Sequence, residues 1–213
     1  MSKPRVLLAD DHLILAEGLR KLLEIDFEVV AVVADGRELL TAAKQYRPDV
    51  IVADVSMPLL NGIEAAMQLA DLGVKAKVVF LTMHHDVAYA RRALAAGAMG
   101  FVLKHSVASE LITAIRQALL GQVYVTPIIA GELLQSYSNE NSRAQTSVPR
   151  LTVRQRVVLQ LLAEGHSAKE IAVVLRISTR TAEVHKARIR KTLGLASTAD
   201  LVKYAIRNGI ISV

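Results

Sequence analysis

The chain has 213 residues, of which 52% are hydrophobic, so it is long enough for two domains with apolar cores. It contains no cysteine, which excludes disulfides and thiolate zinc sites. Residues 149–213 hold twelve Lys and Arg against four Asp and Glu, whereas residues 1–148 hold fourteen against sixteen, so the net charge of +6 is unevenly distributed. This asymmetry predicts a controlling module followed by one that contacts a polyanion. No apolar run approaches the roughly 20 residues that span a bilayer, so we expect a cytoplasmic protein without a membrane segment.

The first apolar run ends at two adjacent acids. Val6 to Ala9 indicates a strand, which stops at Asp10 and Asp11 and is followed by the leucine spacing of a helix. A nucleotide-binding loop would carry glycines here, because the backbone must approach phosphate closely. Two adjacent carboxylates would repel phosphate unless a cation intervened. The sequence therefore disfavours a Gly-rich cofactor site at this loop.

Strand and helix patterns continue to alternate as far as residue 120. The predicted strands are 28–34, 50–53, 77–81 and 100–103, and the predicted helices are 36–46, 63–72, 86–96 and 106–120. Five strands with intervening helices predict an α/β fold, a doubly wound five-stranded parallel sheet. All strands of such a sheet end at one edge, where we expect the polar residues that follow them to cluster. These residues are Asp10, Asp11, Asp54, Thr82 and Lys104.

The chain around Asp54 is the most informative stretch. Four apolar, mostly β-branched residues precede this acid, which is typical of a strand buried on both faces. An Asp at a strand end can be a simple cap, but it also lies where open α/β sheets bind ligands. The clustered acids supply the oxygen ligands that Mg²⁺ prefers, and Asp54 can then act as a nucleophile on a phosphoryl group. Lys104 would neutralise charge on the phosphoryl oxygens, and Thr82 would donate a hydrogen bond to them.

This constellation resembles the receiver domain of bacterial two-component response regulators over residues 4–122. The resemblance implies a flavodoxin-like fold, in which Asp54 accepts a phosphoryl group from a sensor histidine kinase and the chain itself is not an enzyme. The divalent cation, Mg²⁺, would be bound directly by Asp11, Asp54 and the main-chain carbonyl of Ser56, with Asp10 acting through water. Thr82 and Phe101 match the switch residues of the family, and His105 stands where many receivers carry a proline.

Two rival functions stay open at this point. An aspartyl-phosphate phosphatase also uses a strand-end Asp, but such enzymes generally place a second acid two residues later, where this chain has Ser56. The other rival is a DNA-binding regulator that works without phosphorylation and has a degenerate receiver. Measured turnover of phosphate monoesters would identify the enzyme, and DNA binding that is independent of a phosphoryl donor would identify the regulator.

A segment of different composition separates the two modules. We expect a receiver at 1–122, a linker at 123–148 and a DNA-binding domain at 149–213. Residues 127–137 can form one short helix, and residues 138–147 are polar and charged with little to bury. That composition predicts a flexible tether.

The basic back half has helical periodicity throughout, with repeated helix-start residues. Thr152, Ser167 and Ser197 are each followed three residues later by Gln, Glu or Asp, the pattern of a capping box, and Ser178 is a further N-cap. The predicted helices are 152–164, 167–175, 179–193 and 198–208, and three of their ends fall at glycines. Only three residues separate the middle pair, which is the spacing of a helix-turn-helix. Charges that simply face water are the ordinary alternative.

The stretch from Leu151 to Gly194 closely resembles the LuxR-type helix-turn-helix. With the receiver, it implies a NarL/FixJ-type response regulator that binds double-stranded DNA as a homodimer, with RNA polymerase as a further partner. The residues expected on or beside the base-reading turn are Glu183, Val184, Lys186 and Ala187. The residues expected at phosphates or groove walls are Thr181, His185, Arg188 and Lys191, and Arg180 lies on the exposed side of the helix, where Arg and Lys can reach guanine edges or phosphates. A Glu at position 183 could accept a hydrogen bond from cytosine.

The last predicted helix has two open roles. In the family this helix pairs two DNA-binding domains on one operator, and Leu201, Val202 and Ala205 would form the contact face here. The same residues could instead form the core of their own domain.

Overall fold

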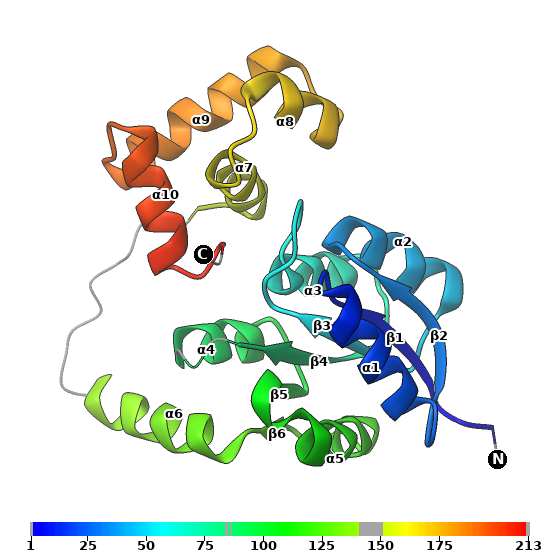
Figure 1. The fold of residues 1–213 in the computed structure, drawn as a ribbon. Coiled ribbons are helices and arrows are strands. Elements are labelled where there is room, and N and C mark those ends of the chain that lie inside the picture. Colours follow the sequence, from blue (N-terminus) through cyan, green and yellow to red (C-terminus); the bar gives the residue numbers. More distant parts are fainter. Residues whose placement is uncertain (1, 84, 86, 141–150, 212–213) are drawn as a thin grey trace. The chain divides into compact units, whose positions relative to one another are not determined.

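The computed structural model describes residues 2–83, 85, 87–140 and 151–211, and the chain divides into two compact units, 1–143 and 144–213. The first unit is built on a parallel sheet with the strand order β2-β1-β3-β4-β5-β6 (Figure 1). Its strands are β1 (Arg5–Ala9), β2 (Glu28–Val33), β3 (Val50–Asp54), β4 (Lys77–Thr82), β5 (Gly100–Leu103) and β6 (Tyr124–Val125). The predicted parallel sheet is confirmed, with one strand added: β6 pairs with β5 at the edge of the sheet.

Helices cover the sheet as the alternating pattern predicts. They are α1 (Leu13–Leu23), α2 (Gly36–Tyr46), α3 (Gly62–Asp71), α4 (Val87–Ala95), α5 (Val107–Leu119) and α6 (Pro127–Glu140), with a short 3-10 helix η1 (Lys104–Ser106). Alternate residues of β1, β3, β4 and β5 pack with α1 and α5 into one fully buried apolar layer. This packing explains why the strands are β-branched and apolar over their whole length, as expected for a sheet buried on both faces.

A glycine allows α3 to begin directly beside the end of β3. Gly62 N donates a hydrogen bond to Val55 O at 2.9 Å, and the neighbouring Asn61 side chain caps the helix by accepting from Glu64 N. A Cβ atom added at Gly62 would lie 2.1 Å from the carbonyl oxygen of Asp54. Only glycine fits so close to the backbone of Asp54. This close contact fixes the loop that follows Asp54.

Helix α6 belongs to the first compact unit, because it packs against α4. The sequence predicted a short helix over 127–137 within a linker, whereas the helix extends to Glu140. Residues 141–147 of the predicted tether lie outside the described residues. The domain boundaries at 122 and 148 stay a prediction.

Within residues 151–211, the second unit contains four helices, α7 (Val153–Ala163), α8 (Ala168–Leu175), α9 (Thr179–Leu193) and α10 (Thr198–Arg207). Capping boxes at Thr152, Ser167 and Ser197 are all present, and Ser178 Oγ accepts from Thr181 N at 3.0 Å. Gly194 ends α9 in the left-handed conformation with φ 66°. The predicted caps are therefore confirmed. None of the helices in the described ranges has the length and apolar character needed to cross a membrane.

Candidate functional site

The sheet brings three of the predicted site residues to one place. Alternate residues of β1, β3 and β5 face α1 and α5. One further step along each alternation reaches Asp10, Asp54 and Lys104, so these three side chains leave the sheet on the same face. They are buried, with exposed fractions of 1%, 4% and 8%. Strand alternation, which is a property of the sequence, therefore positions the site.

One ammonium group bridges two buried carboxylates. Lys104 Nζ lies 2.7 Å from Asp54 Oδ2 and 2.7 Å from Asp10 Oδ2. Burial raises the pKa of Asp54 to about 6, although the charge and hydrogen bond of Lys104 act in the opposite direction. Burial alone would lower the pKa of Lys104, but attraction by Asp54 and Asp10 raises it above the ordinary value. Lys104 is therefore protonated at neutral pH and supplies the positive charge that the two acids need.

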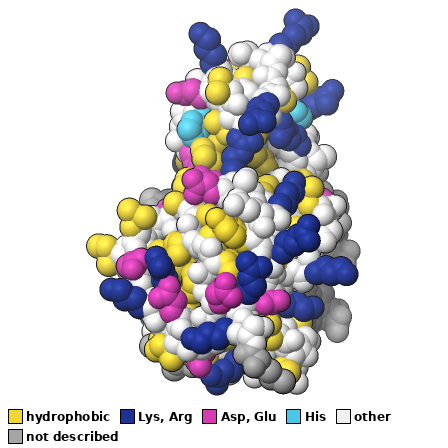
Figure 2. Space-filling view, turned by 90° about the vertical axis from the view of Figure 1, so that its right-hand side faces the viewer, with side chains coloured by type: hydrophobic (Ala, Val, Ile, Leu, Met, Phe, Trp, Pro, Cys, Tyr) yellow, Lys and Arg dark blue, Asp and Glu magenta, His cyan; other side chains and the backbone are white. Residues whose placement is uncertain are grey.

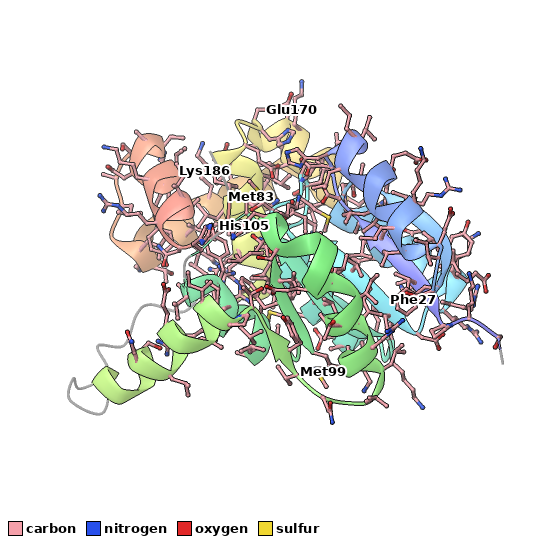
Figure 3. All side chains as sticks on the ribbon, turned by 60° about the horizontal axis from the view of Figure 1, so that its bottom comes forward. Phe27, Met83, Met99, His105, Glu170 and Lys186 are labelled. Atoms are coloured by element: carbon pink, nitrogen blue, oxygen red, sulfur yellow. The ribbon has the colours of Figure 1, made fainter. Side chains whose placement is uncertain are left out.

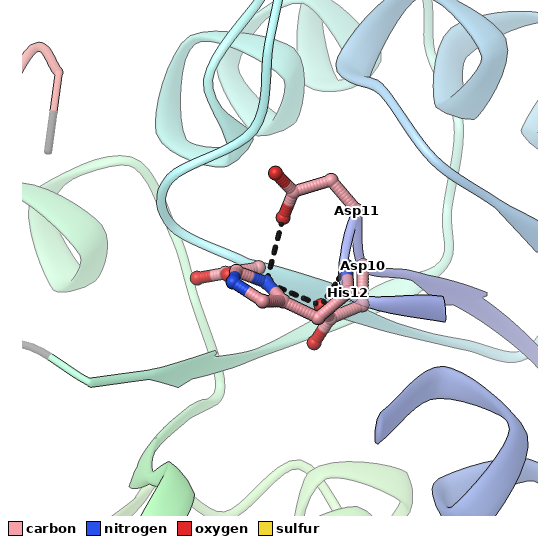
Figure 4. Close-up of side chains that lie close together, drawn as sticks. Asp10, Asp11 and His12 are labelled. Atoms are coloured by element: carbon pink, nitrogen blue, oxygen red, sulfur yellow. Dashed lines mark hydrogen bonds and ion pairs between the residues drawn. The ribbon is translucent and has the colours of Figure 1, made fainter. Parts of the chain in front are cut away.

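Asp11 lies at the solvent side of the same cluster. Its side chain is 34% exposed, and its Oδ1 is 3.0 Å from Nδ1 of His12, which also lies 3.3 Å from Asp10 Oδ1 (Figure 4). Ligand atoms of Asp10, Asp11, His12 and Asp54 all lie within 4.8 Å of one another. Three carboxylates so close together form an oxygen-rich donor set, which fits a hard divalent cation. We call Asp10, Asp11 and Asp54 the acidic cluster.

His12 was not expected in this site. Only the two adjacent acids were expected at this loop, although the imidazole directly follows them in the chain and its place beside them is the signal that could have identified it. Its Nδ1 and its backbone N–H both face Asp10 Oδ1, the N–H at 2.9 Å. His12 therefore orients the acidic cluster from the outside, where water can reach it.

The loop after β3 holds Asp54 in place from the other side. Ser56 N donates a hydrogen bond to Asp54 Oδ1 at 3.1 Å, so one carboxylate oxygen faces Ser56 and the other faces Lys104. A buried carboxylate with both oxygens engaged has a fixed orientation. Ser56 thus lies directly beside Asp54, and its expected role as a carbonyl ligand stays a prediction.

The two predicted switch residues are in the sheet itself. Thr82 is the last residue of β4, is fully buried and pairs with Leu103 of β5. Phe101 is also fully buried and pairs with Phe80. Movement of Phe101 would therefore require a rearrangement inside the core, and its switch role stays a prediction.

Stacked rings join the loops that follow Thr82 and Lys104. The imidazoles of His85 and His105 are parallel within 13°, with centroids 4.7 Å apart. Figure 3 labels Met83 and His105, which directly follow Thr82 and Lys104 in the chain. His105 replaces the proline of many receivers, and within the described ranges every peptide bond is trans. The stacked pair therefore links the segment that follows Thr82 to η1, which begins with Lys104.

The predicted recognition helix is α9, and its faces are as expected. Ala182 and Ile189 are buried against the rest of the unit. Seven of the predicted contact residues are exposed: Arg180, Thr181, Glu183, Val184, Ala187, Arg188 and Lys191. Figure 2 shows exposed Lys and Arg side chains on one face of the molecule, without marking the element from which each comes. This helix can therefore present charges to a polyanion, although no described contact identifies individual partners.

Two predicted contact residues are half-buried. Lys186, labelled on α9 in Figure 3, and His185 lie along the side of the helix. Burial lowers the pKa of His185, and the nearby charges of Arg154 and Arg188 lower it further. His185 Nδ1 has no hydrogen-bond partner among the described residues. A neutral imidazole is thus expected at physiological pH, which favours a hydrogen bond over an ionic contact with phosphate.

Burial separates the two roles that were open for α10. Leu201 and Ala205 are fully buried, and α10 packs closely against α7. These two residues therefore serve the core of their own unit and are not available as a contact face. Val202 is half-buried and Ile206 is 37% exposed. A dimer contact by α10 stays a prediction and would have to use such side chains.

Comparisons with known proteins cover both units. Residues 6–116 match the response regulator receiver domain family, and residues 149–205 match the bacterial regulatory proteins of the luxR family. The oxygen regulatory protein NreC of Staphylococcus aureus is 37% identical over 214 residues, which cover 97% of this chain and 99% of NreC.

Solved structures agree with these matches. A LuxR-family two-component response regulator from Aurantimonas sp. SI85-9A1 is 37% identical, with a TM-score of 0.62, over 64% of this chain and 99% of the other. The RcsB response regulator of Salmonella typhimurium is 27% identical, with a TM-score of 0.67, over 98% of this chain and 99% of RcsB. A complex of RcsB with DNA is 25% identical, with a TM-score of 0.60, over 97% of this chain and 99% of the other.

Proposed function

We propose that a phosphoryl group on Asp54 controls the activity of this chain. The chain belongs to the NarL/FixJ-type response regulators, which combine a receiver domain with a LuxR-type DNA-binding domain. As a member of this family, the chain regulates transcription by binding DNA and is not an enzyme. The observation that carries the proposal is the buried arrangement of Asp54, Asp10 and Lys104. The donor is a phosphohistidine of a sensor histidine kinase, a partner that a receiver domain implies.

Each side chain at the site would have a separate role in phosphoryl transfer. An oxygen of Asp54 attacks the phosphorus, so that a P–O bond forms while the P–N bond to the histidine breaks and the imidazole leaves as its neutral form after taking up a proton. Lys104, which lies 2.7 Å from Asp54, exchanges its contact with that carboxylate for a contact with a phosphoryl oxygen. Thr82 donates its hydroxyl hydrogen to another phosphoryl oxygen. Because these groups are buried, their charges act without much screening by water.

A divalent cation would be held by the acidic cluster together with the carbonyl oxygen of Ser56. The cluster's oxygen donors support Mg²⁺, with Asp11 and Asp54 as direct ligands and Asp10 acting through water. When bound, the cation neutralises charge on the phosphoryl oxygens as they approach the carboxylates. His12 would orient Asp11 and Asp10 toward it.

The second unit would bind double-stranded DNA through the exposed side of α9. Its exposed residues combine basic side chains, which neutralise phosphates, with Glu183 and Val184, which can reach base edges. Structures of RcsB include dimers bound to DNA, and we extend this to a homodimer of the present chain on one operator. A cytoplasmic location and contact with RNA polymerase complete the proposal.

The test is phosphoryl transfer to three versions of the full chain with acetyl phosphate and Mg²⁺, followed by intact mass measurement. The parent and Asp71→Asn, which changes an exposed acid at the end of α3, should each gain one phosphoryl group. Asp54→Asn should gain none, because its amide is not a nucleophile. Equal labelling of Asp54→Asn and the parent would refute the assignment.

The alternative is a regulator whose DNA binding ignores phosphorylation. Duplexes selected by the parent from a random pool can be titrated with protein that has or has not been treated with acetyl phosphate. We expect about 5- to 150-fold tighter binding after phosphorylation, the usual range of coupling between two sites. Equal affinities would favour the alternative.

A further inference from the structure

Thr126 is a buried polar residue at the point where the sheet ends and α6 begins. Strand β6 pairs with β5 at only two positions, Gly100 with Tyr124 and Phe101 with Val125. Beyond them, Thr126 N donates to Phe101 O at 3.0 Å, and the chain then turns into α6. Thr126 is 3% exposed, so its hydroxyl must find partners within the protein.

The Thr126 hydroxyl continues the hydrogen-bond ladder of the sheet. Leu103 N has no further backbone carbonyl of β6 to pair with, because that strand has ended, and it donates instead to Thr126 Oγ1 at 3.2 Å. The same hydroxyl donates its hydrogen to Glu110 Oε2 of α5 at 2.6 Å. A short hydrogen bond to a carboxylate is among the stronger ones in proteins. The threonine is therefore held from both sides.

Glu110 is fixed in turn by Tyr124, which lies in β6. Burial and a hydrogen bond to Glu110 both raise the pKa of Tyr124. The carboxylate thus receives hydrogens from Tyr124 of β6 and from Thr126, which directly follows that strand. Because Glu110 belongs to α5, this set joins the edge strand to a helix that packs deep in the core.

The backbone of Thr126 starts α6. Its carbonyl oxygen accepts hydrogen bonds from Ile129 N and Ala130 N, both at 3.0 Å. The bond from Ala130 is the first regular i→i−4 bond of the helix, so Thr126 is the N-cap residue of α6. One residue therefore contacts the end of β5 through its side chain and the beginning of α6 through its main chain.

The strand end that Thr126 holds is the one that carries Lys104. Leu103 directly precedes Lys104, whose ammonium lies between Asp10 and Asp54. We propose that Thr126, held by Glu110, is a positioning residue that couples the end of β5 to the first turn of α6. This rests on the proposed function, in which Lys104 changes partner when Asp54 is phosphorylated. When Lys104 changes its partner, the end of β5 moves with it. That movement is passed from Leu103 N to the Thr126 hydroxyl and then to α6, the last described helix before the second unit.

A purely structural role would predict something different. If Thr126 only completed the edge of the sheet, its removal would lower stability and leave the response of α6 to phosphorylation unchanged. Coupling predicts that the response itself disappears. The two roles are therefore distinguished by comparing α6 before and after phosphorylation, and not by stability alone.

Hydrogen exchange of the full chain, with and without acetyl phosphate and Mg²⁺, measures this response. The readouts are the amide exchange rates of residues 128–136 and the phosphoryl content of Asp54. Thr126→Val keeps the shape and removes the hydroxyl, whereas Thr126→Ser keeps the hydroxyl. Thr41→Val is the matched control, because it removes a threonine hydroxyl bonded to Arg37 O on an exposed face of α2.

In the parent, Thr126→Ser and Thr41→Val, phosphorylation should change the exchange rates of α6 by at least about fivefold, the lower end of usual coupling. In Thr126→Val and in Glu110→Gln, Asp54 should still be phosphorylated while the rates of α6 change less than about twofold, below that range. An equal change in Thr126→Val and the parent, at equal phosphoryl content, would overturn the coupling alone. A parent that accepts no phosphoryl group would overturn both the coupling and the proposed function.

Discussion

The site of the first unit and the surface of α9 differ in how far their charged groups are buried. Asp10, Asp54 and Lys104 are almost completely buried, and the ammonium lies 2.7 Å from each carboxylate. The basic side chains Arg180 and Arg188 are exposed to water. Buried charges are tolerated only when they are paired, whereas exposed charges cost little and need no partner. The proposed phosphoryl group would therefore meet a preformed site, while a long polyanion would meet a surface whose contacts form only on binding.

The largest effect should come from removing the shared cation. Lys104→Met leaves Asp10 and Asp54 facing each other without a counterion, so in EDTA the free energy of unfolding should fall by about 3 to 5 kcal/mol. Added Mg²⁺ should restore part of this loss, because it can replace the ammonium. Urea denaturation measures both. Lys77→Met removes an exposed lysine at the start of β4 and is the control. Equal losses in the two variants would show that the buried site does not depend on its ammonium.

The second effect is a pH dependence of stability in metal-free protein. The pKa of Asp54 is about 6 in the folded chain against 3.8 ordinarily, so the folded state holds the extra proton between these values. The Asp54 carboxyl therefore contributes about 3 kcal/mol to the free energy of unfolding below pH 4. This contribution is lost as the pH rises through about 6. Asp54→Asn should remove this component of the slope. A difference curve between the two proteins that is flat from pH 4 to pH 7 would contradict it.

Of the two effects expected at α9, the larger is on the choice of base pair in the bound DNA. Glu183 is exposed and carboxylates accept from the amino group of cytosine, so Glu183→Ala should relax the preference at one base pair by about 1 to 3 kcal/mol. Competition between duplexes that differ at single positions measures this. Unchanged selectivity at every position would place Glu183 away from the bases.

The smallest effect is a change in salt dependence. Arg188→Ala should weaken binding to all sequences alike and reduce the slope of log K against log salt by about 1, because one phosphate contact no longer releases a counterion. Arg207→Ala removes an exposed arginine at the end of α10 and should leave the slope unchanged. Titration at several salt concentrations compares the two. Equal slopes for Arg188→Ala and the parent would count against a phosphate contact.

Much of the first site follows from the sequence because it depends on regular geometry. Strand alternation and a common carboxyl edge suffice to bring Asp54 and Lys104 together, although 50 residues separate them. The caps Thr152, Ser167 and Ser197 are equally local, since each acts on a residue three positions away. Such features require no knowledge of tertiary packing.

The remaining features depend on contacts that no periodic pattern contains. Strand β6 has two residues, too few to show an alternation. Leu201 and Ala205 lie on an apolar helix face, and that pattern is the same whether the face covers a core or a second subunit. The direct contact of Asp10 with Lys104 also had to be observed, because side-chain partners across a sheet edge depend on rotamers and burial.

The ammonium of Lys104 also sets the charge balance of the acidic cluster. When all groups are ionised, three carboxylates and one ammonium leave two negative charges, which a single divalent ion cancels. A monovalent ion would leave the cluster negative and a trivalent ion would make it positive, and either imbalance is costly for its two buried members, Asp10 and Asp54. For the cation proposed above, we therefore expect electroneutrality, and not only the size of the coordination shell, to favour a divalent ion.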